Sequence, residues 1–108
     1  MKTPPLLNLL TSPPPDSTAE CFIPLLNHPA FKLEHIISSA HASAADFWYE
    51  QAEDEWVLLL SGSAQLQFAD EIIALTAGDC LLIPAQTRHR VASCSIDARW
   101  LALHHTMV

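Results

Sequence analysis

The fold is decided by two stretches in the second half of the chain, EWVLLLSG at residues 55–62 and GDCLLIPAQTRH at residues 78–89. Each has a short, nearly continuous apolar run next to glycine or proline. Runs of this kind predict strands that are buried on both faces. Both are far shorter than the roughly 20 residues that an α-helix needs to cross a bilayer.

The chain around these stretches has the rhythm of an all-β domain. From residue 31 onward, short runs alternate with turn residues at intervals of about eight to twelve positions, which is typical of a sandwich or barrel. The predicted strands are 31–40, 45–51, 55–60, 63–69, 71–76, 80–84, 88–94 and 98–105. We therefore predict a single domain over residues 1–108 with an antiparallel β-barrel or jelly roll over residues 31–105.

Residues 1–30 have a different composition and contain seven of the eight prolines. Proline removes a backbone donor, so this part is predicted to be an arm outside the regular sheet. Within it, STAE at residues 17–20 fits a capping box, with Ser17 as the N-cap and Glu20 reaching back to it. The sequence thus predicts a short helix, kinked at Pro24.

Composition restricts the partners and the compartment. The chain has five Lys and Arg against twelve Asp and Glu, a formal net charge of −7. Such a surface repels phosphate backbones and anionic lipids, so we expect neither nucleic acid nor membrane as a partner. The three cysteines lack a Cys-x-x-Cys spacing, which favours reduced structural thiols and a cytoplasmic protein.

The spacing of polar residues within the two stretches resembles the two signature motifs of the cupin superfamily. Glu55 lies seven positions before Gly62, and His89 lies five positions after Pro84. The family's two other ligand positions, normally a His-x-His pair, fall on Tyr49 and Gln51. The chain is similar to small one-domain bacterial cupins with this Tyr-x-Gln variation, most of which have no assigned reaction. Gln86 replaces the inner glycine of the second motif.

The resemblance implies a jelly-roll barrel with a site at its mouth. Strand alternation puts Tyr49, Gln51, Glu53 and Glu55 on one face, and it puts His89 on a face with Thr87 and Val91. A carboxylate and an imidazole are good ligands for a divalent transition metal. The hypothesis is one Fe, Mn, Ni or Zn ion at Glu55 and His89, assisted by Gln51, Tyr49 or His104. The pocket residues expected around it are Tyr49, Gln51, Trp48 and Trp100.

The sequence leaves two functional hypotheses open. The first is an enzyme of dioxygenase, isomerase or lyase type, with Glu55 or Tyr49 managing protons. The second is a metal-free ligand-binding or sensory module, which the missing His pair favours. His104 shares a strand face with Trp100 and Ala102, but alternation does not say whether that face or the face of His105 points inward. Apolar residues on both strand faces also predict a homodimer.

Overall fold

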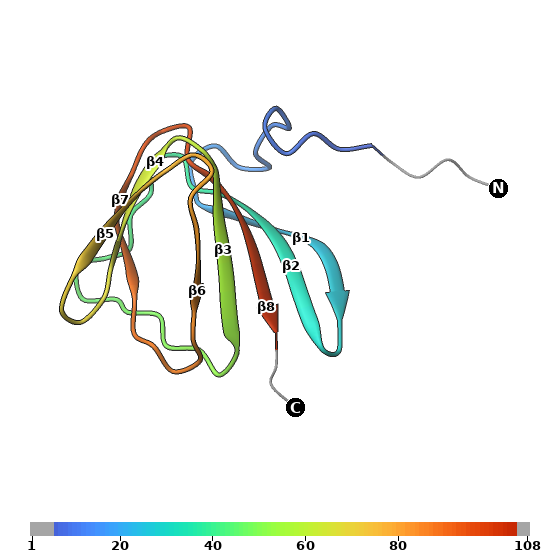
Figure 1. Ribbon diagram of the computed structural model, residues 1–108. Helices are drawn as coiled ribbons and strands as arrows, with labels where there is room; N and C mark the ends of the chain where they lie inside the picture. The colour runs from blue at the N-terminus through green and yellow to red at the C-terminus, as the bar shows by residue number, and fades with distance from the viewer. Residues whose placement is uncertain (1–5, 106–108) are drawn as a thin grey trace.

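Eight antiparallel strands follow one another along the computed structural model, which describes residues 6–105 (Figure 1). They are β1 (Cys21–His28), β2 (Phe31–Ile37), β3 (Asp54–Ser61), β4 (Ser63–Gln67), β5 (Ile72–Thr76), β6 (Cys80–Ile83), β7 (Arg90–Cys94) and β8 (Arg99–His105). The described part of the chain contains no helix, and therefore none long and apolar enough to span a membrane.

The strands form two sheets with the interior of the domain between them. A five-stranded sheet has the order β1-β2-β8-β3-β6, and a three-stranded sheet has the order β5-β4-β7. Neighbours in each sheet are often distant in sequence, as when β8 pairs with both β2 and β3. This arrangement confirms the predicted jelly-roll architecture, and it places the C-terminal strand at the centre of the larger sheet (Figure 1).

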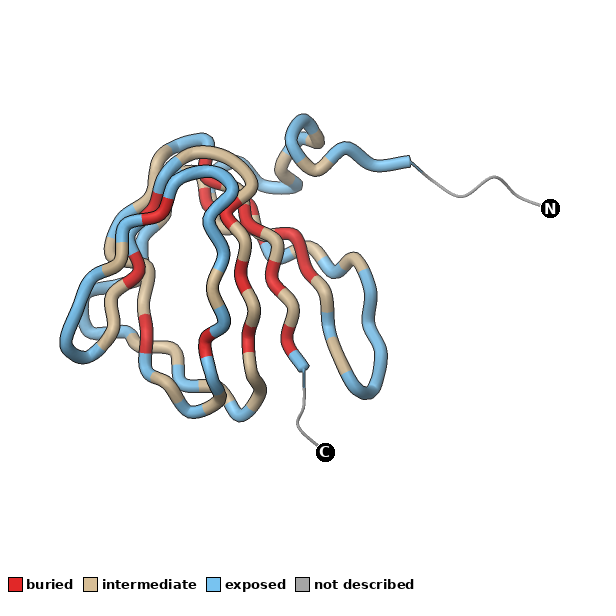
Figure 2. The backbone as a smooth tube through the Cα atoms, in the orientation of Figure 1, coloured by how far each residue is buried: buried red, intermediate tan, exposed pale blue. Residues whose placement is uncertain are grey.

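The hydrophobic core is built from one face of each sheet. Buried residues alternate with more exposed ones along β3 and β8, as Figure 2 shows by colour. Leu59 and Ala102 are completely buried, and Trp100 is 4% exposed. The alternation therefore places Trp100, Ala102 and His104 on the inner face, which settles the orientation that the sequence left open.

Two glycines and one glutamine form the tight turns near the signature stretches. Gly62 and Gly78 have φ of 80° and 97°, in the left-handed region that glycine enters most readily. Gln86 has φ of 64°. It lies where the cupin motif has its inner glycine, and it adopts the left-handed conformation that glycine enters most readily.

The predicted helix near the N-terminus is wrong. Residues Cys21–His28 form strand β1, which pairs with β2 and is the edge of the larger sheet. An edge strand tolerates proline because one row of its donors needs no partner, and the register shifts between Pro24 and Leu26. Glu20 does not cap a helix; its Oε2 accepts a hydrogen bond of 3.0 Å from Ser38 Oγ.

The predicted strand over residues 45–51 is also wrong. This segment is irregular and touches the sheet through one bridge, in which Tyr49 and His89 exchange backbone hydrogen bonds of 2.7 and 3.0 Å. No neighbouring residue of 45–51 extends this bridge into a ladder. It is nevertheless sufficient to bring Tyr49 beside His89.

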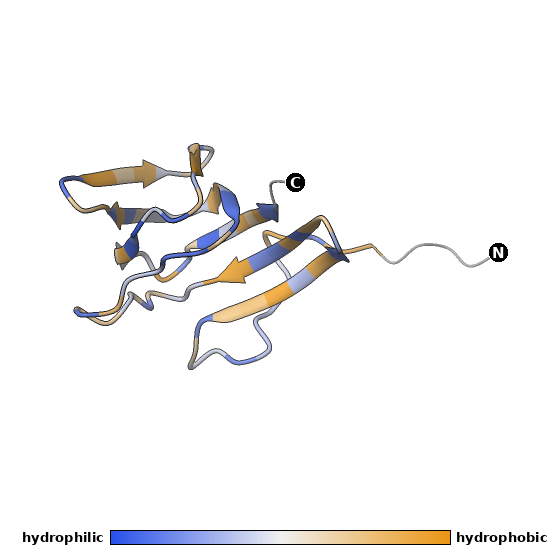
Figure 3. Ribbon diagram, turned by 90° about the horizontal axis from the view of Figure 1, so that it is seen from below, coloured by the Kyte–Doolittle hydropathy of each residue, from blue (hydrophilic) through white to orange (hydrophobic). Residues whose placement is uncertain are grey.

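The outer face of the larger sheet remains apolar. Leu58 pairs with Leu101, and Trp56 pairs with both Leu82 and Leu103, on the face opposite the core. These residues are partly exposed, and Leu82 is 57% exposed. Seen from below, hydrophobic segments occur in both layers of the molecule (Figure 3).

Within the described residues, the N-terminal segment from residue 6 onward does not cover this face. Arg99 Nη1 donates a hydrogen bond of 3.0 Å to the carbonyl oxygen of Leu9, which ties the segment to the start of β8. From there the segment leads away from the barrel (Figure 1), with Leu6 99% exposed. Covering the sheet therefore falls to something other than this arm.

Candidate ligand-binding and acid–base site

A cavity of about 70 Å³ lies between the two sheets. Part of its wall is apolar and comes from Phe22, Ile36, Val57, Leu66, Ile83, Val91 and Trp100. The polar side chains that line it are Glu20, Glu34, Tyr49, Gln51, Glu55, His89 and His104. A mainly apolar cavity with a few convergent polar groups is the usual form of a small-molecule site.

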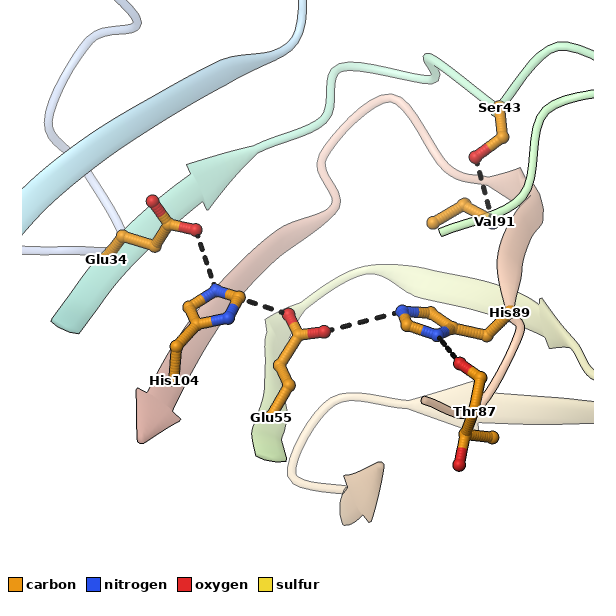
Figure 4. A network of polar contacts seen from close by, with 7 residues as sticks. All are labelled: Glu34, Ser43, Glu55, Thr87, His89, Val91 and His104. Atoms are coloured by element: carbon orange, nitrogen blue, oxygen red, sulfur yellow. Dashed lines mark hydrogen bonds and ion pairs between the residues drawn. The ribbon is translucent and has the colours of Figure 1, made fainter. Parts of the chain in front are cut away.

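The polar wall is centred on the carboxylate of Glu55 in β3. Its Oε1 lies 3.4 Å from His89 Nε2, and its Oε2 lies 3.6 Å from His104 Nε2. Each of the three side chains is at most 10% exposed. Figure 4 shows the carboxylate between the two imidazole rings, one on each side. Residues from three separate parts of the sequence thus form one ionic cluster.

Glu34 in β2 extends the cluster at its far end. Its Oε1 accepts a hydrogen bond of 3.0 Å from His104 Nε2, and its Oε2 lies 3.7 Å from Lys32 Nζ. Sequence reasoning missed this residue. Its position in the strand could have indicated this role. Glu34 lies two residues before Ile36 and therefore on the same strand face, and Ile36 also lines the cavity. A lone carboxylate on the inward face of an apolar strand needs a partner.

The orientation of His89 is fixed by its neighbours. Its Nδ1 is 2.9 Å from the carbonyl oxygen of Thr87. Because a carbonyl oxygen only accepts, Nδ1 carries a proton there, and Nε2 faces Glu55. The ring also stacks on Tyr49, with centroids 5.5 Å apart. Packing and hydrogen bonding therefore hold Nε2 toward the carboxylate.

The protonation of both imidazoles is favoured by their surroundings. Burial lowers the pKa of His89, but hydrogen bonds to Glu55 and to the Thr87 carbonyl outweigh it, and the pKa is raised. The hydrogen bond to Glu34 raises the pKa of His104, against a smaller effect of burial. The same hydrogen bond lowers the pKa of Glu34. The cluster thus alternates imidazole and carboxylate side chains, and the neighbouring carboxylates favour the protonated form of both rings.

Tyr49 and Gln51 line the cavity without joining the cluster. Burial raises the pKa of the Tyr49 phenol, and the charges of Glu20, Glu55 and Glu34 add to the effect. The Oε1 atom of Gln51 is buried and has no hydrogen-bond partner. Both residues therefore present polar groups to the cavity interior.

The structure brings the predicted site residues together in the cavity lining, with the exception of Trp48. Glu55, His89, His104, Tyr49, Gln51 and Trp100 all line the cavity. Trp48 was expected there, but it is not part of the lining and its ring lies 5.1 Å from the guanidinium carbon of Arg88. His105 is exposed on the opposite face from His104. Glu53 is likewise absent from the lining.

These residues do not fit the metal that the fold family commonly holds. His89 Nε2 and His104 Nε2 face different oxygens of Glu55 from two sides, so the donors do not converge on one point (Figure 4). Among residues 6–105, no group of three or more His, Cys, Asp or Glu side chains is arranged to hold a metal ion.

Comparison with known proteins agrees with this architecture. Residues 38–104 match the cupin domain family. A Ralstonia eutropha JMP134 protein, provisionally named a mannose-6-phosphate isomerase, is 38% identical with a TM-score of 0.87, over 96% of this chain and 100% of that one. No curated protein matches.

Two more distant structures share the fold. A cupin superfamily protein from Desulfitobacterium hafniense DCB-2 is 17% identical with a TM-score of 0.76, over 99% of this chain and 94% of that one. An RmlC-like cupin from Desulfovibrio desulfuricans is 18% identical with a TM-score of 0.68, over 97% and 96%. The chain belongs to the cupin family.

Proposed function

We propose that this cupin binds a small organic molecule in the barrel cavity and moves a proton on it with Glu55, His89 and His104. The observation that carries the proposal is the buried Glu55 carboxylate, held between two imidazole Nε2 atoms at 3.4 and 3.6 Å in the cavity wall. A carboxylate can accept a proton and an imidazolium can return one. Groups of this kind, placed beside a bound substrate, accelerate proton transfer about 10²–10⁴-fold.

The reaction class follows from these groups. Isomerisation by proton shift removes a proton from one atom of the substrate and returns one to another, and elimination removes a proton and protonates the leaving group. Both can use a carboxylate as base and an imidazolium as acid. The provisional name of the Ralstonia eutropha protein is also that of an isomerase. We do not extend its sugar phosphate to this cavity, because the described lining has three carboxylates and no Lys or Arg that would pair with a phosphate.

Proton exchange on a bound ligand tests the proposal. Compounds that raise the thermal midpoint would be incubated in D₂O and their C–H signals followed by NMR. Wild type is expected to exchange a proton for deuterium, and Glu55→Gln to lose about 100-fold or more of this rate. Glu53→Gln is the matched control, since Glu53 lies outside the cavity lining. A ligand that binds wild type without exchange would favour the sensory module.

Metal binding is the competing hypothesis, and elemental analysis decides it. The protein would be purified without chelator or metal-affinity tag, beside Glu55→Ala and His89→Ala. The acid–base proposal expects background levels of Fe, Mn, Ni and Zn in all three, also after reloading. About one equivalent in wild type, lost in both folded variants, would instead assign the site to a metal ion.

We also propose that two copies pair through the outer face of the larger sheet. Trp56, Leu58, Leu101 and Leu103 form a continuous apolar surface there, and the N-terminal segment leads away from it. Burial of such a surface is the main driving force of association. A second copy offers the same surface with two-fold symmetry.

A further inference from the structure

The cavity is too small to enclose most organic molecules. Its volume is about 70 Å³. A cavity of roughly 150 Å³ holds one benzene molecule, and sites for larger ligands measure roughly 300–1,000 Å³. A molecule with more than a few non-hydrogen atoms therefore places only its reacting end beside Glu55. The rest of it has to extend through the mouth of the cavity, where the cavity opens to solvent.

The exposure of the lining residues locates this mouth. The apolar floor consists of residues that are at most 5% exposed, namely Val57, Leu66, Ile83 and Trp100. Phe22 lines the same cavity but is 47% exposed, which is more than any other described lining residue. A lining side chain that is half open to solvent lies at the opening. The mouth is therefore at β1, the edge strand of the larger sheet (Figure 1).

An apolar row connects the floor with this mouth. Phe22 on β1 pairs with Ile36 on β2, and Ile36 pairs with Trp100 on β8. All three residues line the cavity. Neighbouring strands lie about 4.8 Å apart, so the row is roughly 10 Å long. Trp100 Nε1 already donates a hydrogen bond of 3.0 Å to Ser38 Oγ. The row thus offers only apolar contact to a ligand that passes along it.

The exposed ring of Phe22 is a contact surface that the rest of the chain leaves open. The pairing of two copies proposed above uses the opposite face of the sheet and does not cover this ring. Phe22 and Ile36 also lie outside residues 38–104, which match the cupin domain family. An aromatic ring gains both from burial of its area and from contact with a second ring. A ligand with an apolar tail therefore binds more tightly by covering Phe22.

We propose that Phe22 is a specificity-determining residue that selects ligands with a compact polar reacting end and an apolar or aromatic tail. The reacting end lies beside Glu55, and the tail passes over Ile36 and Phe22 to the mouth. The inference rests on the proposed function, because it names the ligand class of the same cavity. It adds a residue that neither cupin motif contains.

The test uses three ketones with the same reacting end and different tails: butan-2-one, 4-phenylbutan-2-one and 4-oxopentanoate. The last has a carboxylate in place of the phenyl ring. Each is titrated into methyl-labelled protein at neutral pH while the methyl signals of Val57 and Ile83 are followed by NMR. Wild type is expected to bind 4-phenylbutan-2-one about ten-fold more tightly than butan-2-one. It should bind 4-oxopentanoate no more tightly than butan-2-one.

Phe22→Ala should lose about ten-fold of the affinity for 4-phenylbutan-2-one and keep the affinity for butan-2-one, which does not reach the mouth. Leu26→Ala is the matched control. It shortens an apolar side chain that is 54% exposed on the same strand but outside the cavity lining. This variant should behave as wild type. Unchanged binding of butan-2-one also reports that Phe22→Ala retains the cavity and the fold.

The outcomes separate this inference from the proposed function. Unchanged affinity of Phe22→Ala for 4-phenylbutan-2-one, or equal binding of 4-phenylbutan-2-one and 4-oxopentanoate, would overturn the role of Phe22. If butan-2-one still moves the Val57 and Ile83 signals, the cavity nevertheless remains a ligand site. Binding that depends on Phe22, without exchange of the protons beside the carbonyl group in D₂O, would support the specificity and contradict proton transfer. If no ketone moves the signals, both proposals fail.

Discussion

Gln86 is in a left-handed backbone conformation, with φ of 64°, at the turn that precedes His89. Its backbone N–H donates a hydrogen bond of 2.7 Å to the carbonyl oxygen of Gln51, which links the two halves of the site. A residue with a Cβ pays roughly 1–2 kcal/mol for this conformation. The turn is therefore maintained by its contacts and not by the preference of the residue.

Gln86→Gly is expected to raise the free energy of unfolding by about 0.5–1 kcal/mol, since glycine adopts this φ without strain. Chemical denaturation measures the change. Gln65→Gly on β4 is the matched control and should be destabilising by a similar amount, because it places glycine in a strand. Equal destabilisation by both variants would show that Gln86 is not strained.

The ion pair of Glu34 and His104 makes stability depend on pH from both sides. The lowered pKa of Glu34 contributes stability above its ordinary value of 4.5, and this is lost as the pH falls through the lowered pKa. The raised pKa of His104 contributes stability below its ordinary value of 6.5, and this is lost as the pH rises through the raised pKa. The ion pair therefore stabilises the fold most between pH 4.5 and pH 6.5.

Glu34→Gln should therefore reduce the free energy of unfolding by about 1–3 kcal/mol between pH 4.5 and 6.5, and by less on either side. Urea denaturation at a series of pH values measures this difference. Glu71→Gln is the control for the loss of one carboxylate at the surface. A difference independent of pH would show that Glu34 acts through packing alone.

At the residue scale, the sequence predicted the centre of the site but not its surroundings. Glu55 and His89 were identified by their spacing to glycine and proline, which is local information. Glu20 and Glu34 depend on contacts with Ser38 and His104, 18 and 70 positions away, and no local pattern contains such pairings. Trp48 was expected in the pocket without a pattern that places it there, and its ring lies instead beside Arg88, outside the cavity lining.

Among the elements, the turn between β3 and β4 is the most constrained. Gly62 has φ of 80°, and a Cβ there would lie 2.3 Å from Ser95 Oγ and 3.0 Å from Ala98 Cα. The Ser95 hydroxyl cannot easily move, because it donates to Asp97 Oδ1 and accepts from the Ser63 backbone N–H. This turn therefore requires glycine both for its backbone and for its space.

Gly62→Ala is expected to lower the free energy of unfolding by about 2–4 kcal/mol, through backbone strain and steric overlap together. Gly78→Ala provides the matched comparison. Gly78 has φ of 97° but nothing within 4 Å of an added Cβ, so only about 1 kcal/mol of strain is expected. Thermal or chemical denaturation of both variants measures the two changes in the free energy of unfolding. Equal effects would contradict the steric account.

Strands were predicted correctly where apolar and polar residues alternate clearly. The prediction failed where two sequence patterns favoured different structures. Alternation in residues 98–105 correctly indicated β8. In residues 17–26 the capping-box pattern and Pro24 favoured a kinked helix, whereas pairing with β2 determined an edge strand. Such pairing is a tertiary effect and overrides local preference. Residues 45–51 have strand-like composition but follow the barrel rim.

For the whole molecule, the apolar outer face predicts association. Sedimentation is expected to give about twice the mass of one chain, and Leu58→Glu is expected to give monomers because it places a charge in the apolar face. Ile72→Glu on β5, where the wild-type residue is 54% exposed on the smaller sheet, should remain dimeric. A monomeric wild type would contradict the proposed pairing.

The ionic cluster brings residues of β2, β3 and β8 and of the segment before β7 together in one cavity. Its chemistry depends on Glu55 lying between two imidazoles whose pKa values are raised. The most direct measurement is an NMR titration of the ring signals of His89 and His104, in wild type and in Glu55→Gln. Our account predicts that both pKa values lie above the ordinary 6.5 in wild type and fall in the variant. Values at or below 6.5 that do not change in Glu55→Gln would contradict it.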